Sequence, residues 1–557
     1  MRRLMASLIT GAVLLIAPSG VLAQEKVMVA GIEATRIVIA PPQTELARII
    51  KAGLSDAYVS ANRETRAYQQ AQKLYYFYGA RHFEPLWLTE DTDGKIAFSA
   101  KAEKILEVFK EAELEGFRPS DYLTPELDVA AAGTDPAKLA ALETAFSAAA
   151  ARYAQDAYGG RVAPTQVSKL WTITPRVVNE AEMLMKLAAS DTPDQILRDL
   201  SPKHREFLQL KAALGKFYDG SVIDAAVTIP DGPALKPGMK DERVTLLRQR
   251  LDLPEPEIPE TAGVAAAADI TYDDALVEAV KGFQDSLGLT ADGVVGPATV
   301  AALNGGSATT KDDIIANMER WRWQPDDFGD FHVHVNIPEF KLVIMDHGKQ
   351  HYTTRVVVGT PKNQTPVFFD EIEHIVVNPY WNVPASIASN EIAPRLASNP
   401  GYLAGQNMEL LHGGKVVNAA AIDWSTANIR NFHIRQRPGD GNALGRIKFL
   451  FPNQHDVYLH DTPSKSLFQR SFRAYSHGCV RVQNPMEFAG ALLAREPKVT
   501  VASLESMFGN SERWVNLDTH IPVHITYFTL RVDEDGTIRS YGDVYGLNKK
   551  LISLLNE

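Results

Sequence analysis

The chain has 557 residues and very little cysteine, since Cys479 is its one thiol. No disulfide can form within the chain, which excludes the small secreted folds that disulfides stabilise. No tract of clustered lysine and arginine is present, and the net charge is −11. This charge argues against nucleic-acid binding, because affinity for phosphates depends on cationic side chains that displace counterions.

Long apolar runs are also missing beyond the N-terminus. None reaches the roughly 18 residues that a transmembrane helix needs. What is present is ordinary globular composition, with 45% apolar and 22% charged residues, rather than collagen-like or disordered usage. At about 150 residues per domain, the length predicts three or four domains.

The N-terminus has the layout of a secretory signal peptide. Arg2 and Arg3 precede an apolar stretch from Leu4 to Ile16, and Val21-Leu22-Ala23 ends the segment before Gln24. The apolar stretch is short for a membrane span, although an uncleaved anchor remains the alternative. We therefore expect residues 1–23 to be removed, leaving an exported chain with no stable membrane span.

The neighbours of Cys479 indicate a reactive site. The segment Tyr475 to Val482 reads Tyr-Ser-His-Gly-Cys-Val-Arg-Val, and a thiol among histidine, glycine and arginine is atypical of a core position. The alternative is a small buried apolar residue. A nucleophilic cysteine needs a lowered pKa, from a nearby imidazole or cation, and a base that holds its proton.

His460 is the candidate base. It lies in Val457 to Pro463, where a short strand ends in a turn and presents a side chain at a sheet edge. Because neighbouring strand side chains point to opposite faces, we expect Asp461 to cap the turn and a backbone carbonyl to orient His460. Gly478 allows a carbonyl to approach the N–H groups of Gly478 and Cys479, the candidate oxyanion donors.

The motifs His460-Asp461-Thr462-Pro463 and Ser476-His477-Gly478-Cys479-Val480-Arg481 resemble the signature of the L,D-transpeptidases, the YkuD-type cysteine enzymes of peptidoglycan. Four further segments resemble the large multidomain branch of that family: 317–323, 378–384, 442–449 and 451–453.

The resemblance implies that Cys479 is the nucleophile and His460 its base and later acid. It implies that Ser476, His477, Gly478 and Arg481 shape the site, and it implies neither a metal nor a cofactor. Tyr458 and Trp381 are candidates for lining the cleft, with core packing as the alternative.

A second segment indicates a small helical module. Residues 244–251 and 275–284 have helical apolar spacing, and Asp292-Gly293 and Gly296-Pro297 mark turns before a short helix at 299–303. The pattern resembles the three-helix peptidoglycan-binding module, and the alternative is an ordinary helical linker domain. A flexible loop is expected at 253–268 inside it.

From residue 331 the pattern becomes β-rich. Residues 331–337, 341–345 and 354–358 alternate with period two, and Asp346-His347-Gly348 is a hairpin signal. The long segment 386–444 is rich in glycine, asparagine and arginine. So long an irregular segment beside a site predicts a cap or lid.

The sequence therefore predicts a multidomain α+β protein in which a helical scaffold and a peptidoglycan-binding module precede a β-rich catalytic domain with a cap insertion. The predicted parts are a signal peptide at 1–23, a linker at 24–45, a helical scaffold at 46–230, the binding module at 231–305 inserted in the scaffold, a scaffold helix at 306–328, and the catalytic domain at 329–557 with its lid at about 386–444 and a C-terminal β-hairpin at 523–541.

A metal site is the main chemical alternative. His332 and His334 share one face of a predicted strand, as zinc ligands can, but no cysteine or carboxylate follows at ligand spacing. Cys479, His477 and His460 could together bind a metal ion, and this set is the more specific form of the metallohydrolase alternative.

The resemblance implies that Cys479 forms a thioester at the third residue of a peptidoglycan tetrapeptide stem and releases D-Ala. Transfer to a diaminopimelate amine gives a 3-3 cross-link; water, a D-amino acid or a protein amine are the other acceptors. It also implies acylation by carbapenems and, with the signal peptide, a periplasmic location. The rivals are a non-catalytic wall-binding scaffold, which predicts loss of Cys479 or His460, and a papain-type peptidase, which predicts the opposite order of cysteine and histidine.

Overall fold

The structure is a computed structural model that describes residues 24–29, 32–37, 39–60, 66–219, 229–230, 232–251, 253–254, 270–286, 289–305, 309–496 and 498–557. The predicted signal peptide and most of the predicted loop at 253–268 lie outside these residues. None of the helices within them has both the length and the apolar character needed to cross a bilayer.

The chain divides into two compact units. The first comprises residues 1–161 and 176–202, and the second comprises residues 162–175 and 203–557. The helix at 205–218 thus belongs to the second unit, whereas the sequence placed it within a scaffold domain ending at residue 230. Its burial explains the difference, because Phe207, Leu210 and Leu214 pack with Ile314 and Phe528 of the second unit.

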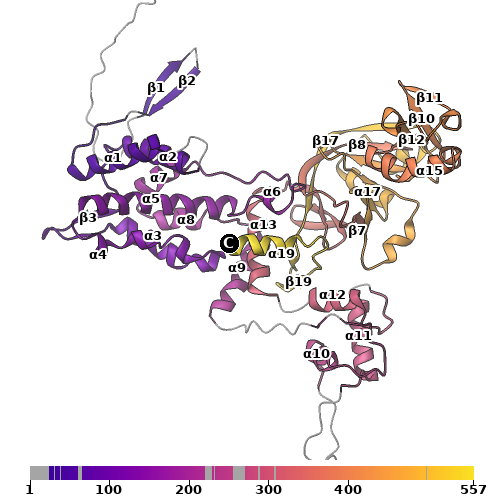
Figure 1. Cartoon of the computed structure of the whole chain (residues 1–557), viewed down its shortest axis with the longest axis horizontal. Coiled ribbons are helices and arrows are strands. Elements are labelled where there is room, and N and C mark those ends of the chain that lie inside the picture. The colour runs from indigo at the N-terminus through magenta and orange to yellow at the C-terminus, as the bar shows by residue number, and fades with distance from the viewer. Residues whose placement is uncertain are drawn as a thin grey trace, which may run out of the picture. The chain divides into compact units, whose positions relative to one another are not determined.

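The first unit is helical (Figure 1). Its helices are α1 (Glu45–Ser60), α2 (Arg66–Gly79), α3 (Ala100–Lys110), α4 (Val129–Ala132), α5 (Pro136–Gly159), α7 (Glu180–Ala189) and α8 (Pro193–Arg198), with 3-10 turns η1 (Ala112–Glu115), η2 (Pro119–Asp121) and η3 (Pro125–Leu127). Strands β3 (Leu88–Glu90) and β4 (Ile96–Phe98) pair in it. The predicted linker also contains an antiparallel pair, β1 (Gln24–Val29) with β2 (Ile32–Ile37), in keeping with the valines and isoleucines of that segment.

The alanine-rich helix α5 forms the centre of this unit. Asp135 caps its N-terminus by accepting hydrogen bonds from two backbone N–H groups. Its buried Glu143 accepts hydrogen bonds from the Tyr78 hydroxyl (2.8 Å) and the N–H groups of Leu86 (2.7 Å) and Trp87 (3.0 Å). Burial raises the pKa of Glu143 to about 7. One carboxylate therefore ties the end of α2 and the start of the β3 segment to α5.

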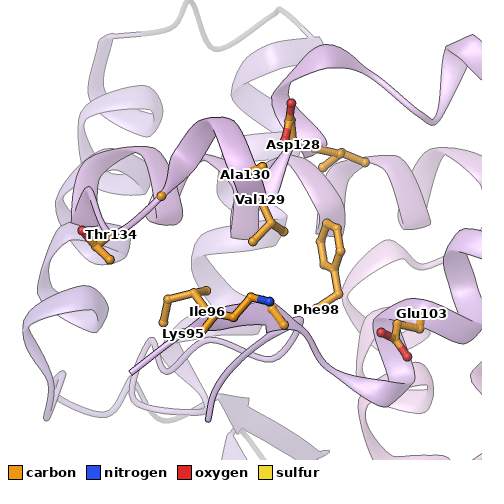
Figure 2. Close-up of a pocket in the computed structure, with 11 residues that line it drawn as sticks. Lys95, Ile96, Phe98, Glu103, Asp128, Val129, Ala130 and Thr134 are labelled. Carbon is orange, nitrogen blue, oxygen red and sulfur yellow. The ribbon is translucent and has the colours of Figure 1, made fainter. Parts of the chain in front are cut away.

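A pocket of about 720 Å³ lies between β4 and α4 in this unit. Figure 2 shows Ile96 and Phe98 of β4 facing Val129 of α4 across it, with Glu103 and Asp128 at its rim. The lining is thus largely apolar, with carboxylates at the edge.

The predicted binding module is present in the second unit as three helices, α10 (Arg243–Arg250), α11 (Asp274–Ser286) and α12 (Pro297–Gly305). Leu247, Leu276 and Leu303 are fully buried in its core. The amide of the buried Gln284 accepts a hydrogen bond from the Gly293 N–H (2.9 Å) and donates one to the Val294 carbonyl (3.0 Å). These bonds hold the turn that the Asp-Gly pair predicts.

The predicted catalytic domain of the second unit is built on a sheet of nine strands in the order β15-β7-β16-β14-β13-β8-β17-β5-β6, and β7 also pairs with β6. The strands are β5 (Phe331–Asn336), β6 (Lys341–Asp346), β7 (Lys349–Gly359), β8 (Phe368–Val377), β13 (Ile447–Leu450), β14 (Leu459–His460), β15 (Ala474–Ser476), β16 (Val480–Val482) and β17 (Arg513–Thr526). The predicted strands and the β6–β7 hairpin are thereby confirmed.

Helices and short turns complete this part. They are α6 (Pro164–Val167), α9 (Arg205–Tyr218), α13 (Lys311–Arg322), η7 (Lys465–Gln469), α17 (Pro485–Leu492), η8 (Leu493–Arg495), α18 (Val501–Ser506) and α19 (Leu547–Asn556). One face of the sheet is buried on α17, where Phe488 packs edge-on against Phe449 of β13 with ring centroids 4.7 Å apart. Side chains alternate along strands, so the residues next to Phe449 project to the other face.

The C-terminal hairpin is shorter than the predicted 523–541. It consists of β18 (Leu530–Val532) and β19 (Ile538–Ser540), whereas Val523 to Thr526 extend β17 and pair with β5. Strand β17 ends before β18 begins because the backbone between them bonds to side chains: the Phe528 N–H donates to Asn336 (2.8 Å) and the Thr529 N–H donates to Asn317 (3.1 Å). Buried asparagine side chains thus end β17 before the hairpin begins.

The predicted lid is a folded subdomain rather than an irregular segment. It contains α14 (Ala385–Ile387), a π-helical turn η4 (Ala388–Ile392), α15 (Ala393–Ser398), α16 (Tyr402–Gly405), η5 (Ala419–Ala421) and η6 (Ile429–Asn431). Its four-stranded sheet has the order β11-β10-β12-β9, formed by β11 (Lys415–Val417), β10 (Met408–His412), β12 (His433–Gln436) and β9 (Trp381–Asn382). Leu396, Leu410 and Ile434 form a separate core, and these scattered apolar residues are why the segment folds. We call this subdomain the insertion.

His332, His334 and His524 gather around Phe328 on β5 and β17. His332 bonds the Gly329 carbonyl (2.6 Å), His334 bonds the Thr526 hydroxyl (2.7 Å), and His524 bonds the Phe328 carbonyl (2.9 Å). Burial lowers the pKa of all three rings, that of His524 to about 4. The rings are therefore packed and hydrogen-bonded to protein atoms instead of converging on a common point.

This burial predicts acid lability of the sheet. His524 has a pKa of about 4 when folded and about 6.5 when unfolded, so the unfolded chain binds more protons between these values and stability falls as the pH drops from 6.5 to 4. The expected loss is about 3 kcal/mol. His524→Gln should reduce the fall in melting temperature between pH 7 and pH 4.5.

The matched control is His520→Gln, because His520 lies on the same strand but is half exposed. Its melting temperature should follow the wild-type pH dependence. An unchanged pH dependence in His524→Gln would show that His524 is not the group responsible.

Candidate active site

The two motifs meet on adjacent strands of the central sheet. Strand β14 runs parallel to β16 with His460 opposite Arg481, and β13 runs antiparallel to β14 with Lys448 opposite His460. Directly paired residues project from the same face. His460, Arg481 and Lys448 therefore share the face that points away from α17, and Cys479 and Tyr458 share it by alternation.

A backbone carbonyl orients the ring of His460, as predicted. The ring is 4% exposed, and its Nδ1 lies 2.5 Å from the carbonyl oxygen of Asp461. Because a carbonyl only accepts, Nδ1 carries the hydrogen and Nε2 keeps a lone pair. Burial, reinforced by the charge of Arg481, lowers the pKa of His460 to about 3, so the ring is a neutral base at physiological pH.

The carboxylate of Asp461 caps the turn, also as predicted. It accepts hydrogen bonds from the N–H groups of Arg446 (2.9 Å) and Thr462 (2.7 Å) and from the ammonium of Lys465 (2.6 Å). Gly445 adopts φ +61° beside it, and a β-carbon there would lie 2.2 Å from Oδ2 of Asp461. The glycine thus makes room for the carboxylate whose own carbonyl holds His460.

The environment of the Cys479 thiol differs from the prediction. The side chain is partly exposed, but the surrounding protein desolvates the thiolate and raises the pKa of Cys479 to about 11. The N–H and hydroxyl of Tyr458 and the charges of Arg481 and Lys448 act in the opposite direction and do not overcome it. The expected lowered thiol pKa is therefore wrong: desolvation outweighs the cations.

In the resting site Cys479 and His460 are consequently both neutral. The Sγ atom of Cys479 donates to the carbonyl of Asp456 at 3.9 Å, and the described residues include no hydrogen bond between Sγ and the ring of His460.

The turn before Cys479 is held by side chains. Ser476 donates its hydroxyl hydrogen to the Cys479 carbonyl (2.5 Å) and accepts from the Gly478 N–H (3.1 Å). Gly478 adopts φ +119°, a conformation that glycine tolerates, and its carbonyl accepts from Thr365 (2.8 Å). The Gly478 N–H is thus already bonded, which removes it as an oxyanion donor. The Cys479 N–H has no acceptor among the described residues, so it remains a candidate oxyanion donor.

His477 contacts the insertion. Its Nε2 lies 2.8 Å from Oε1 of Glu391, and both side chains are nearly half exposed. Glu391 belongs to the π-helical turn η4, an irregularity that often marks functional positions. The contact links the insertion directly to the turn that carries Cys479.

Of the two aromatic residues predicted to line the cleft, one lies in the site and the other lies in the insertion. Tyr458 lies in the site, where burial and the neighbouring charge of the Cys479 thiolate raise its pKa. Trp381 lies in β9 and packs against the core of the insertion, and it makes no contact with Cys479 in the part of the chain described. No three histidine, cysteine or acidic residues among those described lie close enough together to hold a metal ion.

Sequence reasoning missed Lys448, Asp456, Thr365 and Glu391. Lys448 stands in a run that resembles the multidomain branch, but its place depends on the pairing of β13 with β14. Thr365 and Glu391 come from segments more than 80 residues before Cys479. No local signal in the sequence marks either residue.

The position of Gly445 gives a test of how His460 is held. Gly445→Ala should lower the melting temperature and slow any reaction at Cys479, since the new β-carbon displaces Asp461 and with it the carbonyl that orients His460. Strain of this kind costs about 1–3 kcal/mol.

Gly441→Ala is the matched control, because a β-carbon at Gly441 meets nothing within 4 Å. Thermal melting and the rate of Cys479 modification check both variants. Equal behaviour of the two would contradict the role assigned to Gly445.

Comparison with known families agrees with this geometry. Residues 330–501 match the family described as "L,D-transpeptidase catalytic domain", residues 72–214 match a "Scaffold domain", and residues 259–303 match a "Putative peptidoglycan binding domain". A protein of Haemophilus influenzae named "Putative L,D-transpeptidase" is 35% identical over 242 residues, which are 43% of this chain and 48% of that protein. The chain therefore spans about half the length of this curated relative.

Solved structures with partial similarity include three L,D-transpeptidases. That of Xylanimonas cellulosilytica is 17% identical over 53% of this chain and 99% of its own, with a TM-score of 0.16. That of Mycobacterium smegmatis is 12% identical over 35% and 58%, with a TM-score of 0.19, and that of Stackebrandtia nassauensis is 14% identical over 54% and 96%, also at 0.19. The matches of residues 330–501 to the L,D-transpeptidase catalytic domain and of residues 259–303 to the peptidoglycan-binding domain agree with the resemblance carried by the two motifs and by the helical module.

Proposed function

We propose that the protein is an L,D-transpeptidase that acts on peptidoglycan stem peptides through a thioester at Cys479. One observation carries the proposal: the Asp461 carbonyl fixes the tautomer of His460 so that Nε2 is a free base on the strand next to the thiol. Nucleophilic catalysis by a thiol needs such a base and its orienting group.

Acylation begins from the neutral thiol of Cys479 and the neutral ring of His460. Nε2 of His460 takes the proton of the Cys479 thiol as Sγ bonds to the carbonyl carbon of the third stem residue. The bond from that carbon to the terminal D-Ala nitrogen then breaks, and the nitrogen takes the proton from His460. The products are a thioester and free D-Ala.

The charged intermediates are stabilised locally. The imidazolium of His460 is held by the Asp461 carbonyl, and the developing thiolate lies near Arg481, Lys448 and the Tyr458 hydroxyl. The Cys479 N–H is the remaining candidate for the oxyanion. The groups that fail to ionise the resting thiol thus act once the reaction creates charge.

Deacylation is the reverse with a new amine. An acceptor nitrogen attacks the thioester and gives its proton to His460, and the carbon–sulfur bond breaks to restore the thiol. A diaminopimelate side-chain amine gives a 3-3 cross-link. Water instead gives L,D-carboxypeptidase trimming, and a protein amine gives tethering of that protein to the wall. A non-catalytic scaffold predicts loss of Cys479 or His460, whereas both residues are present on neighbouring strand segments.

The other parts fit a wall enzyme. The match of residues 259–303 to a peptidoglycan-binding family supports anchoring on the polymer, and the N-terminal sequence supports export to the periplasm. The catalytic steps require no metal or other cofactor.

Intact-protein mass spectrometry tests the proposal. The full mature chain, incubated with disaccharide-tetrapeptide or with a carbapenem, should gain the mass of the acyl group, and Cys479→Ala should gain none. His460→Gln should acylate about 10²–10⁴-fold more slowly, the usual contribution of a general base.

Cys479→Ser controls for side-chain shape, since the hydroxyl fits the site but is a poorer nucleophile. The product of the tetrapeptide reaction identifies the acceptor. A folded wild-type protein that forms no adduct with either reagent would refute the catalytic function.

A further inference from the structure

Lys448 is a largely buried cation on the same face as His460, and the mechanism above uses its charge only near the developing thiolate. It is 8% exposed, and its ammonium makes no hydrogen bond or ion pair with any described residue. The rings of Tyr458 and Trp514 lie 5.5 and 5.9 Å from it. A partly desolvated ammonium without an ion-pair partner is stabilised by a nearby anion, so this position favours the binding of one.

No carboxylate among the described residues forms an ion pair with Lys448. The charge of Glu512 acts on Lys448, but the two oxygens of Glu512 accept hydrogen bonds elsewhere, Oε1 from the Tyr380 N–H (2.8 Å) and Oε2 from the indole of Trp514 (3.2 Å). Trp514 is 54% exposed, so this end of the site is accessible to a ligand. A carboxylate of the ligand could form the ion pair that the Lys448 ammonium lacks.

The strand register places Lys448 next to the proton donor. Arg481, His460, Lys448, Val376 and Trp514 lie opposite one another in a row across β16, β14, β13, β8 and β17. Paired residues have β-carbons about 5 Å apart. In an α-amino acid the nitrogen and the carboxylate carbon are only two bonds, about 2.5 Å, apart. An amine at Nε2 of His460 therefore has its own α-carboxylate within reach of the neighbouring lysine.

We propose that Lys448 is a specificity-determining residue that binds the α-carboxylate of the amino acid leaving or entering the thioester. The proposal rests on the proposed function, and it restricts which amines can act as the acceptor of the acyl group. The departing D-Ala is an α-amino acid, and the diaminopimelate side-chain amine is borne by a carbon that also carries a carboxylate. The site accepts these amines and free D-amino acids, and it rejects isolated amines such as protein lysine side chains.

The transfer is balanced without a further reactant. The acceptor nitrogen forms the new bond to the thioester carbon while the carbon–sulfur bond breaks, and one proton passes from the amine through His460 to the thiolate. The carboxylate at Lys448 is unchanged throughout. Its effect is to hold the nitrogen in line with the thioester.

A competition experiment tests this assignment. The purified mature chain is given disaccharide-tetrapeptide with D-alanine isotopically labelled and D-alaninamide at equal concentrations, and mass spectrometry measures both exchange products and the thioester. Both acceptors react with the same thioester, so their product ratio is independent of the acylation rate. The product ratio is corrected for the fraction of each amine that is unprotonated at the assay pH, because the amide is the less basic amine. With this correction the wild type should prefer D-alanine at least tenfold, the usual contribution of a charge-assisted hydrogen bond.

Three variants complete the design. Lys448→Met should bring the ratio near one by reducing transfer to D-alanine, and Lys448→Arg should restore part of the preference. Lys349→Met, an exposed lysine of β7, should keep the wild-type ratio. Thermal melting verifies that each variant is folded.

The outcomes separate the two proposals. A wild type that forms the thioester but uses both acceptors equally overturns the role of Lys448 and leaves the transpeptidase function standing. A folded Lys448→Met that slows both acceptors and keeps the wild-type ratio also overturns it, because the lysine then acts only on the thiolate or Arg481 binds the carboxylate. A wild type that forms no thioester refutes the function on which the assignment rests.

Discussion

The proposed catalytic arrangement depends on one hydrogen bond, from Nδ1 of His460 to the carbonyl of Asp461. It fixes the tautomer of a buried ring and leaves Nε2 as the base. The bond exists because the turn after β14 is held by the Asp461 carboxylate, and that carboxylate fits because Gly445 has no side chain. Gly445 and the carboxylate and carbonyl of Asp461 thus fix the position of Nε2 of His460 relative to the sheet.

The sheet also sets the charge state of the site. Desolvation keeps Cys479 and His460 neutral at rest, despite two cations on the same face. The cations are then available for charge that appears during the reaction or arrives with the substrate. The same alternation that buries Phe449 on α17 places Lys448 and His460 side by side, so core packing and site geometry have one origin.

Much of this could be predicted from the sequence, because it is local. The Cys479 and His460 motifs, the capping role of Asp461, the period-two strands and the three-helix module all follow from short-range pattern. The insertion was expected to be irregular, since its apolar core residues are scattered among glycine and asparagine, and the thiol pKa was expected to be low, since burial cannot be read from neighbours in sequence. Lys448 shares the face of Cys479 through strand pairing, and Thr365 and Glu391 contact its neighbours Gly478 and His477. These are contacts between distant segments, which no local pattern encodes.

The central claim is that the resting nucleophile is a neutral thiol beside a neutral base. The pH dependence of Cys479 alkylation by iodoacetamide measures this directly, because only the thiolate reacts. The account predicts a rate that rises about tenfold per pH unit from pH 6 to pH 9 with no inflection, as a pKa of about 11 requires. A rate that levels off at a pH below 8 would show a preformed thiolate–imidazolium pair and contradict it.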